Sequence, residues 1–265
     1  MKNKKLVGRI LITIAAIVIT IIAAILSVIG LTAGKNMKAM NQCLDASLSK
    51  ISDYYTLTKR DAGEYEKIKL YGILNFDADQ YEIEELGNLS VMRVNMGFMQ
   101  MATLVITPRD KNLPLLSADY MYIMGNRKAY LEFYDVVGQK DEQYQTLLTE
   151  LSNQLAKYED LENITPSEAW YEHLLTVTAY KAGKADADAV LQEMLTDCLV
   201  TYLKQSQQFP LLEASARQEK LRITKEYTDG LIEKGGISTD VFKSALGEEE
   251  TTRFFDNVFF GTLAE

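Results

Sequence analysis

The sequence predicts an α/β fold of the α-β-α sandwich type, in which helices cover both faces of a central antiparallel β-sheet, plus one N-terminal transmembrane helix. Three observations support this. Apolar residues alternate with period two through most of residues 66–137, apolar residues recur at helical spacing from about residue 144 onward, and residues 10–34 carry no charge. Period two sends successive side chains to opposite faces of a strand, whereas helical spacing gathers them on one face of a helix.

The uncharged segment from Ile10 to Gly34 is dominated by Ile, Ala, Leu and Val. A helix of this length reaches roughly 37 Å and crosses the ~30 Å hydrocarbon layer with some tilt. A cleaved signal peptide has a shorter apolar region of about 7–15 residues, although Leu31-Thr32-Ala33 is an acceptable cleavage site. We divide the chain into a basic N-terminal segment at 1–9, a transmembrane helix at 10–34, a membrane-proximal helix at 35–62 and an α/β/α domain at 63–265.

Charge around the apolar segment predicts its orientation, because the side richer in Lys and Arg stays in the cytoplasm. The flanking basic residues are Lys2, Lys4, Lys5 and Arg9 before the segment, and Lys35 and Lys38 after it. This bias predicts a single-pass protein of the cell membrane whose domain lies outside the cytoplasm. Residues 39–265 hold 22 of the 28 basic residues and all 37 acidic ones, a net charge of −15. Such a domain repels nucleic acid and anionic lipid headgroups, so we expect no nucleic-acid partner.

The alternating region predicts an antiparallel meander. A strand at 68–72 is expected to turn at Asp77–Gln80 into a strand at 81–85, and the strands within 91–106 are expected to turn near Gly97-Phe98. Gly125-Asn126 is a tight-turn pair, which predicts a hairpin between strands at 115–124 and 128–136.

Helical spacing predicts helices at 35 to about 59, 144–158, 190–202, 211–234 and 239–263. Gly235-Gly236 would end one of them. Residues 170–180 fit either a helix or a strand, and local propensity favours the helix.

One acidic residue stands in a proline-led apolar strand, Asn112-Leu113-Pro114-Leu115-Leu116-Ser117-Ala118-Asp119-Tyr120. A carboxylate is costly to bury unless it is paired, hydrogen-bonded or protonated. Asp119 is therefore a candidate proton donor. The alternative interpretation is a carboxylate on the solvent face of a half-exposed strand.

Three segments together carry a family resemblance. Leu113-Pro114-Leu115-Leu116-x-x-Asp119 resembles the central strand of the ferredoxin-dependent bilin reductases, which reduce linear tetrapyrroles. Residues 242–247 and 253–260 are similar to the C-terminal helix of that family, and residues 170–181 to its Trp…Arg-Pro strand, with lysine for arginine. The order agrees from about residue 40 to the end. The resemblance implies the α-β-α sandwich, and a strand at 170–180.

The resemblance also implies a chemistry. These enzymes hold no bound cofactor or metal, and an external donor such as ferredoxin supplies electrons while side chains supply protons. Asp119 would lie beneath the bilin as proton source. Asn95 stands where the family usually has a glutamate, Thr103 where many members have a histidine, and another family acid falls near Gly235-Gly236. Candidate partners of the propionates are Arg93, Arg109, Lys111 and Lys181, and a flexible lining could come from Met96, Met99, Met101, Met121 and Met124. Solvated surface charges and ordinary core methionines are the alternatives.

Two functional hypotheses follow. In the first, the chain is a membrane-anchored protein that binds, and reduces, a linear tetrapyrrole. In the second, it is a non-catalytic extracytoplasmic binding or structural protein that keeps the fold. Ferredoxins are cytosolic and acidic, so a ferredoxin-dependent enzyme would need a cytoplasmic domain, and a flavoprotein or small-molecule reductant is an alternative donor. The sequence contains no His/Cys cluster with metal-ligand spacing.

Overall fold

The computed structural model describes residues 2–71 and 74–263, with side chains from residue 18 onward apart from 237 and 238. Its centre is an antiparallel sheet with the strand order β1-β3-β4-β5-β6-β7-β9-β8, and β2 pairs with β3 beside β1. The strands are β1 (Leu57–Arg60), β2 (Lys67–Leu70), β3 (Leu74–Ile83), β4 (Gly87–Asn95), β5 (Met99–Pro108), β6 (Leu115–Ile123), β7 (Asn126–Tyr134), β8 (Glu162–Asn163) and β9 (Leu175–Lys184). Neighbours from β3 to β7 are consecutive in sequence, as in a meander.

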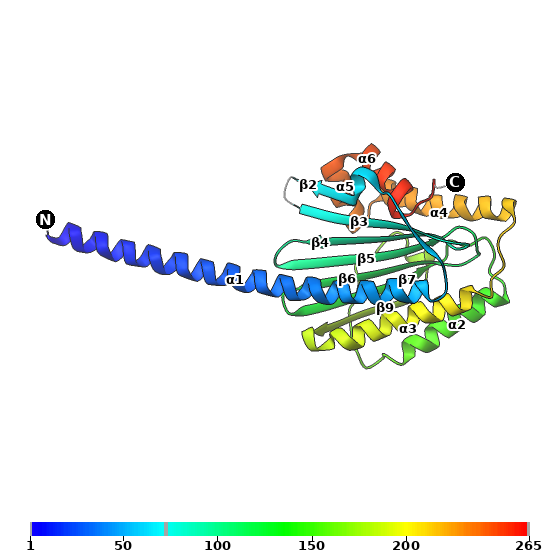
Figure 1. The fold of residues 1–265 in the computed structure, drawn as a ribbon, viewed down its shortest axis with the longest axis horizontal. Helices are drawn as coiled ribbons and strands as arrows, with labels where there is room; N and C mark the ends of the chain where they lie inside the picture. Colours follow the sequence, from blue (N-terminus) through cyan, green and yellow to red (C-terminus); the bar gives the residue numbers. More distant parts are fainter. Residues whose placement is uncertain (1, 72–73, 264–265) are drawn as a thin grey trace.

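Helices cover both faces of the sheet, which confirms the predicted fold class (Figure 1). One face carries α1 (Lys2–Ser52), α2 (Glu142–Ala156) and α3 (Asp188–Ser206). The other face carries α4 (Ala214–Lys234), α5 (Ile237–Leu246) and α6 (Glu248–Phe254), followed by a π-helical turn at Phe255–Phe259. The N-terminal half of α1 extends away from the body of the molecule (Figure 1).

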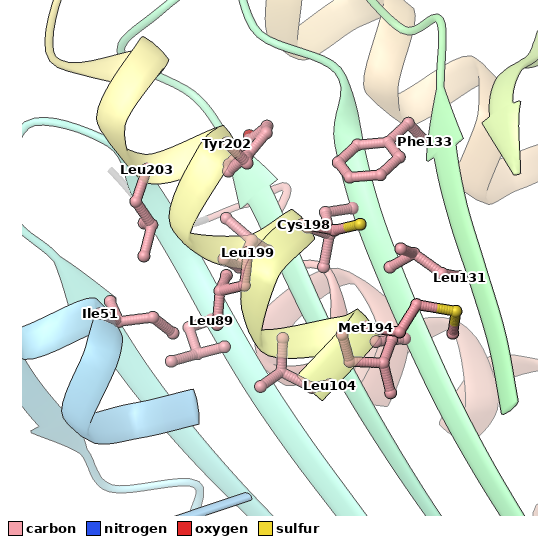
Figure 2. Close-up of a cluster of buried hydrophobic side chains, with 14 of the residues drawn as sticks. Ile51, Leu89, Leu104, Leu131, Phe133, Met194, Cys198, Leu199, Tyr202 and Leu203 are labelled. Atoms are coloured by element: carbon pink, nitrogen blue, oxygen red, sulfur yellow. The ribbon is translucent and has the colours of Figure 1, made fainter. Parts of the chain in front are cut away.

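The larger core lies between the sheet and the layer of α1, α2 and α3. Figure 2 shows Met194, Cys198 and Leu199 of α3 packed over Leu104 and Leu131 of the sheet. Every one of these side chains is buried. Burial of apolar surface contributes roughly 25 cal/mol per Å², so this cluster is a main source of the fold's stability.

The second core is aromatic and lies under α4, α5 and α6. Phe242 and Phe254 stack with ring centroids 5.2 Å apart. Lys220 of α4 is also buried here, and its Nζ donates to the carbonyl oxygens of Leu113, at 2.7 Å, and Val136. These two bonds hold α4 over the strand ends, because a buried ammonium group must keep its hydrogen-bond partners.

Helix α1 covers both the predicted transmembrane helix and the predicted membrane-proximal helix, but it begins earlier and ends earlier than predicted. It runs without a break through residues 34 and 35, and its C-terminal half packs Met40, Leu44 and Ile51 into the larger core. It ends at Ser52, so the prediction of helix to about residue 59 was wrong. The segment Leu57–Arg60 is edge strand β1, whose backbone pairs with β3.

The turn predicted at Asp77–Gln80 was also wrong, because β3 runs straight through it. Phe76, Ala78 and Gln80 are buried on one face, while Asp77 is exposed on the other. The acidic side chains of Asp77 and Asp79 therefore lie on the face of the sheet opposite Phe76 and Ala78, within a strand that has neighbours on both sides. The chain reverses near Tyr71 instead, and the alternation predicted to reach Gly72 falls outside the described residues.

The other predicted turns and breaks were partly right. The turns near Gly97-Phe98 and at Gly125-Asn126 join β4 to β5 and β6 to β7. The helix predicted at 239–263 is interrupted by Gly247, whose φ of 85° suits glycine and separates α5 from α6. Residues 172–174 form a 3-10 turn and 175–184 form β9, so the strand implied by the resemblance is confirmed and the helix favoured by local propensity was wrong.

Candidate active site

A cavity of about 910 Å³ lies between the sheet and the layer that contains α4 and α5. Its floor comes from β5, β6, β7 and β9, and its sides come from residues 164–172, from residues 234–236, 239 and 240, and from the aromatic C-terminal segment. Ligand sites usually measure about 300–1,000 Å³, so the size suits a small organic molecule.

Strand pairing brings the polar floor together. Thr103 of β5 pairs with Asp119 of β6, Asp119 pairs with Tyr130 of β7, and Tyr130 pairs with Tyr180 of β9. All four side chains line the cavity. The residues between them, such as Ala118 and Leu131, face the larger core on the other side. Period-two alternation therefore places one polar row under the cavity and one apolar row under α3.

Asp119 is the central acid of this floor. It is partly accessible from the cavity but is surrounded by protein, and this desolvation raises its pKa from 3.8 to about 6. Thr103 donates a hydrogen bond to Oδ1 and Ser117 donates one to Oδ2 at 3.3 Å, and both bonds lower the pKa. The negative charge of Glu132 raises it again. Asp119 is thus set to exchange a proton near neutral pH.

Glu132 is a second floor carboxylate that our sequence analysis missed. The hydroxyl of Tyr134 donates to Oε2 and that of Tyr180 donates to Oε1, the latter at 2.9 Å. Glu132 pairs with Ser117 of β6, two residues along the strand from Asp119. The sequence could have revealed Glu132. The Gly125-Asn126 turn fixes the register of the β6–β7 hairpin, and the alternation of side chains along β7 then puts Glu132 on the same face as Asp119.

One wall of the cavity is built around Trp170. Its Nε1 donates to the carbonyl oxygen of Gly235 at 2.9 Å, and the Nζ of Lys234 lies 4.6 Å from the centre of its ring. Gly230 of α4 makes this packing possible, since a Cβ there would lie only 2.3 Å from Cη2 of Trp170. Further rings in the lining belong to Tyr171, Tyr227, Phe255, Phe259 and Phe260.

The structure brings together two of the five residues that the sequence analysis placed in the site. Thr103 and Asp119 share the cavity floor. Arg93 pairs with Ala102 and forms an ion pair with Asp79, and Asn95 bonds to Gln100 near the β4–β5 turn. Lys181 pairs with Ala129 and donates to Asn163 at 2.8 Å. Neither Arg93, Asn95 nor Lys181 lines the cavity, because strand parity sends all three to the opposite face.

Of the other residues that the sequence analysis considered, some line the cavity and some lie outside it. Arg109 is buried against Glu82, and Lys111 donates to the carbonyl oxygen of Ser206 at 2.9 Å, both outside the cavity lining. Met101 and Met121 line the cavity. Met96, Met99 and Met124 belong to the strand ends near the turns and are not among the lining residues.

The cavity is rich in acids. Asp240 of α5 lies beside Gly235 and lines the cavity. A carboxylate is therefore present near Gly235-Gly236, where the family resemblance led us to expect an acid but the sequence analysis named none. The acidic lining residues are Asp119, Glu132, Glu168, Glu172 and Asp240, and the basic ones are Lys128 and Lys234. His173 is exposed and not part of the lining. Within the described residues, no three His, Cys, Asp or Glu side chains meet as they would around a metal ion.

Comparisons with known proteins agree with this architecture. No protein-family model matches the chain, and no curated protein sequence matches it. Among solved structures, the fold is that of a bilin reductase. The crystal structure of selenomethionine-labelled phytochromobilin synthase from tomato, in complex with biliverdin, superposes with a TM-score of 0.66 over 85% of this chain and 84% of that chain. The two chains are 16% identical, so the likeness establishes the shared fold.

Proposed function

We propose that the cavity binds a linear tetrapyrrole, and that Asp119 supplies a proton while an external donor such as ferredoxin reduces the bound pigment. The observation that carries the proposal is a protonatable carboxylate in the floor of an aromatic-walled cavity of about 910 Å³. The biliverdin held by the tomato enzyme, whose fold the chain shares, supports the same class of ligand.

The lining suits two of the kinds of polar group on such a pigment. Pyrrole N–H groups are donors, and the floor offers the carboxylates of Asp119 and Glu132 to accept from them. The propionates are anions, and Lys128 and Lys234 are the cavity's cations. We assign to these two lysines the role that the sequence analysis expected of Arg93, Arg109, Lys111 and Lys181. A charge-assisted bond of this kind contributes about 1.5–3 kcal/mol when it is partly buried.

The proposed reaction adds electrons and protons to the pigment in equal number, with no cofactor bound to the chain. Electrons come from the external donor. Asp119 delivers a proton, because its raised pKa keeps part of it protonated near neutral pH. Thr103 and Ser117 hold the resulting carboxylate in place through their hydrogen bonds. Solvent then restores the proton from the exposed side, where Glu168 and Glu172 line the cavity.

Binding is tested by titrating the purified chain with biliverdin and recording the visible spectrum. We expect a shifted and sharpened band, and roughly tenfold weaker binding in Lys128→Met. Lys157→Met, at the exposed end of α2, should bind like the unaltered chain. Absence of any spectral change with biliverdin and related linear tetrapyrroles would remove the proposed site.

Proton delivery is tested by adding a low-potential reductant to the complex without oxygen. The unaltered chain should bleach or shift the pigment band, and Asp119→Asn should bind the pigment but stall at an intermediate. Asn95→Ala lies outside the cavity and serves as the control. Equal progress in the unaltered chain and in Asp119→Asn would show that Asp119 is not the donor.

Binding without reduction is the second candidate, and the charge bias around the apolar segment favours it. That bias predicts an extracytoplasmic domain, where a cytosolic ferredoxin has no access. A pigment complex that no one- or two-electron donor alters would assign the chain to this class.

A further inference from the structure

The N-terminal half of α1 exposes a continuous apolar surface. Val18 and Leu31 mark its limits among the described side chains, with exposed fractions of 47% and 70%. The large apolar side chains exposed between them are Ile19, Ile21, Ile22, Ile25, Leu26 and Val28. This helix is long and apolar enough to cross a membrane by length and composition. A surface of this kind requires an apolar environment, and the part of the chain that the structure describes leaves it uncovered.

The body of the protein contacts α1 at a defined level. A Cβ at Gly97, in the β4–β5 turn, would lie 3.7 Å from Cγ2 of Ile29. The buried Asn36 donates to Oε1 of Gln100 at 2.7 Å and to the carbonyl oxygen of Met124, in the β6–β7 turn, at 3.0 Å. Two hairpin turns are therefore fixed beside residues 29–36 of α1, where the helix leaves the sheet (Figure 1).

Two exposed aromatic residues occupy this same end of the sheet. Phe98 follows Gly97 in the β4–β5 turn, and Tyr71 lies where β2 ends before β3. Each side chain is 55% exposed. Antiparallel pairing brings both turns to one end, since β3 begins where β4 ends and β5 begins. Aromatic side chains are enriched at the boundary between lipid and water.

We propose that this end of the sheet rests in the interface of a lipid bilayer, with Phe98 and Tyr71 inserted at headgroup depth beside α1. The level of Ile29 carries the inference. Ile29 is six residues before Lys35, the first charged residue after the apolar segment, which is about 9 Å along the helix axis. A turn fixed beside Ile29 therefore lies below the level of Lys35, on the lipid side.

Charge around the turns is compatible with this position even though the domain is acidic overall. Lys35 and Lys38 of α1, and the exposed Lys69 and Lys184, lie at this end of the molecule. Acids at this end include Asp77 of β3, Asp186 and Asp188, and Asp188 is paired with Arg127. We therefore expect docking on a neutral phosphatidylcholine bilayer through apolar insertion.

The inference rests on α1 crossing the bilayer and is independent of the cavity's ligand. The test uses the full chain in nanodiscs of phosphatidylcholine brominated on its acyl chains, in a Trp170→Phe background. Single tryptophans are introduced as Phe98→Trp, Tyr71→Trp, Ile22→Trp within the span and Leu211→Trp as a control. Leu211 is 53% exposed and precedes α4, and the neighbouring Leu212 bonds to Asp110 at the opposite end of the sheet.

Bromine quenches tryptophan only at short range, so depth is read directly from the emission. We expect at least twofold quenching for Phe98→Trp and Tyr71→Trp, stronger quenching for Ile22→Trp and none for Leu211→Trp. Circular dichroism confirms that each variant is folded. If Ile22→Trp is quenched and both turn variants behave like Leu211→Trp, α1 crosses the bilayer but the sheet stands clear of it, and the inference is overturned. If Ile22→Trp is not quenched either, α1 does not span and the inference also fails.

Discussion

At the scale of single residues, Asp119 makes the protein's stability depend on pH. Its pKa is raised from 3.8 to about 6 in the folded chain, mainly by desolvation. Between these values the folded state binds more protons than the unfolded state, so the free energy of unfolding falls as pH rises from about 4 to 6. The decrease in the free energy of unfolding that Asp119 causes is at most about 3 kcal/mol, and screening by water in the cavity makes it smaller. Urea unfolding at several pH values measures it.

Matched variants separate Asp119 from the other acids. In Asp119→Asn the decline between pH 4 and 6 should become smaller, while the exposed Asp77→Asn should leave it unchanged. Thr103→Val removes a hydrogen bond that lowers the pKa of Asp119, so the decline should extend to higher pH. The same pH curve for Asp119→Asn and the unaltered chain would contradict this account.

Some residues of the site could be predicted from the sequence and others could not. The difference depends on strand register, which decides the face of the sheet to which each side chain points. Asp119 was found because an acidic residue in an apolar strand is conspicuous, and Thr103 was found through the family resemblance. Arg93 was misplaced although the turn near Gly97-Phe98 was predicted, because the register of that hairpin, which opposes Arg93 to Ala102, was not applied. For Lys181 no short turn was available: β9 reaches β7 only after a long connection, and its pairing with Ala129 arises from tertiary contacts.

At the scale of elements, the fit between Trp170 and α4 should be sensitive to one methyl group. Gly230→Ala improves helix propensity by up to about 1 kcal/mol, but its Cβ would lie 2.3 Å from a ring held by Gly235. Overpacking of this kind costs about 1–3 kcal/mol, so we expect net destabilisation and a red-shifted Trp170 emission. Unfolding curves and fluorescence of the variant test this.

Gly125→Ala is the control for that substitution, because nothing lies within 4 Å of the added Cβ. It should change the free energy of unfolding by less than about 0.5 kcal/mol. Unaltered emission and stability in Gly230→Ala would mean that α4 shifts freely and that the wall of the cavity is not fixed by this contact.

The same contacts explain which elements the sequence predicted. The β4–β5 and β6–β7 hairpins were predicted correctly, and so were α2 and α3 with their apolar stripes, since these signals are local. Residues 170–180 were ambiguous, because the strand they enter, β9, depends on pairing with β7 and on the hydrogen bond that anchors Trp170 at the end of α4. Strand β1 was missed for a similar reason: it is four residues long and depends on the backbone of β3.

At the scale of the whole molecule, fold class was predictable while sequence similarity is almost lost. The order of alternating and helical segments defines a meander between helix layers, and the tomato bilin reductase shares that architecture at 16% identity. The cavity depends on finer detail, because its shape follows from how α4, α5 and the C-terminal aromatics leave one face of the sheet partly uncovered. Periodicity does not contain that information.

Under the proposed function, the orientation of α1 in a membrane decides which electron donor could reach the cavity. Four basic residues precede the apolar segment and two follow it, so we expect the domain outside the cytoplasm. In Leu211→Cys the new thiol is exposed, whereas the native Cys43 and Cys198 are buried and give little background. A membrane-impermeant maleimide should therefore label Leu211→Cys in intact cells.

Reversing the charge bias tests the physical cause of that orientation. Replacing Lys2, Lys4 and Lys5 by asparagine leaves Arg9 against Lys35 and Lys38, one basic residue against two. In this background, labelling of Leu211→Cys should require permeabilised cells for a substantial fraction of the chains. If Leu211→Cys in the otherwise unaltered chain is labelled only after permeabilisation, the domain is cytoplasmic. A cytosolic ferredoxin could then reach the cavity, and this result would favour reduction of the pigment over binding without reduction.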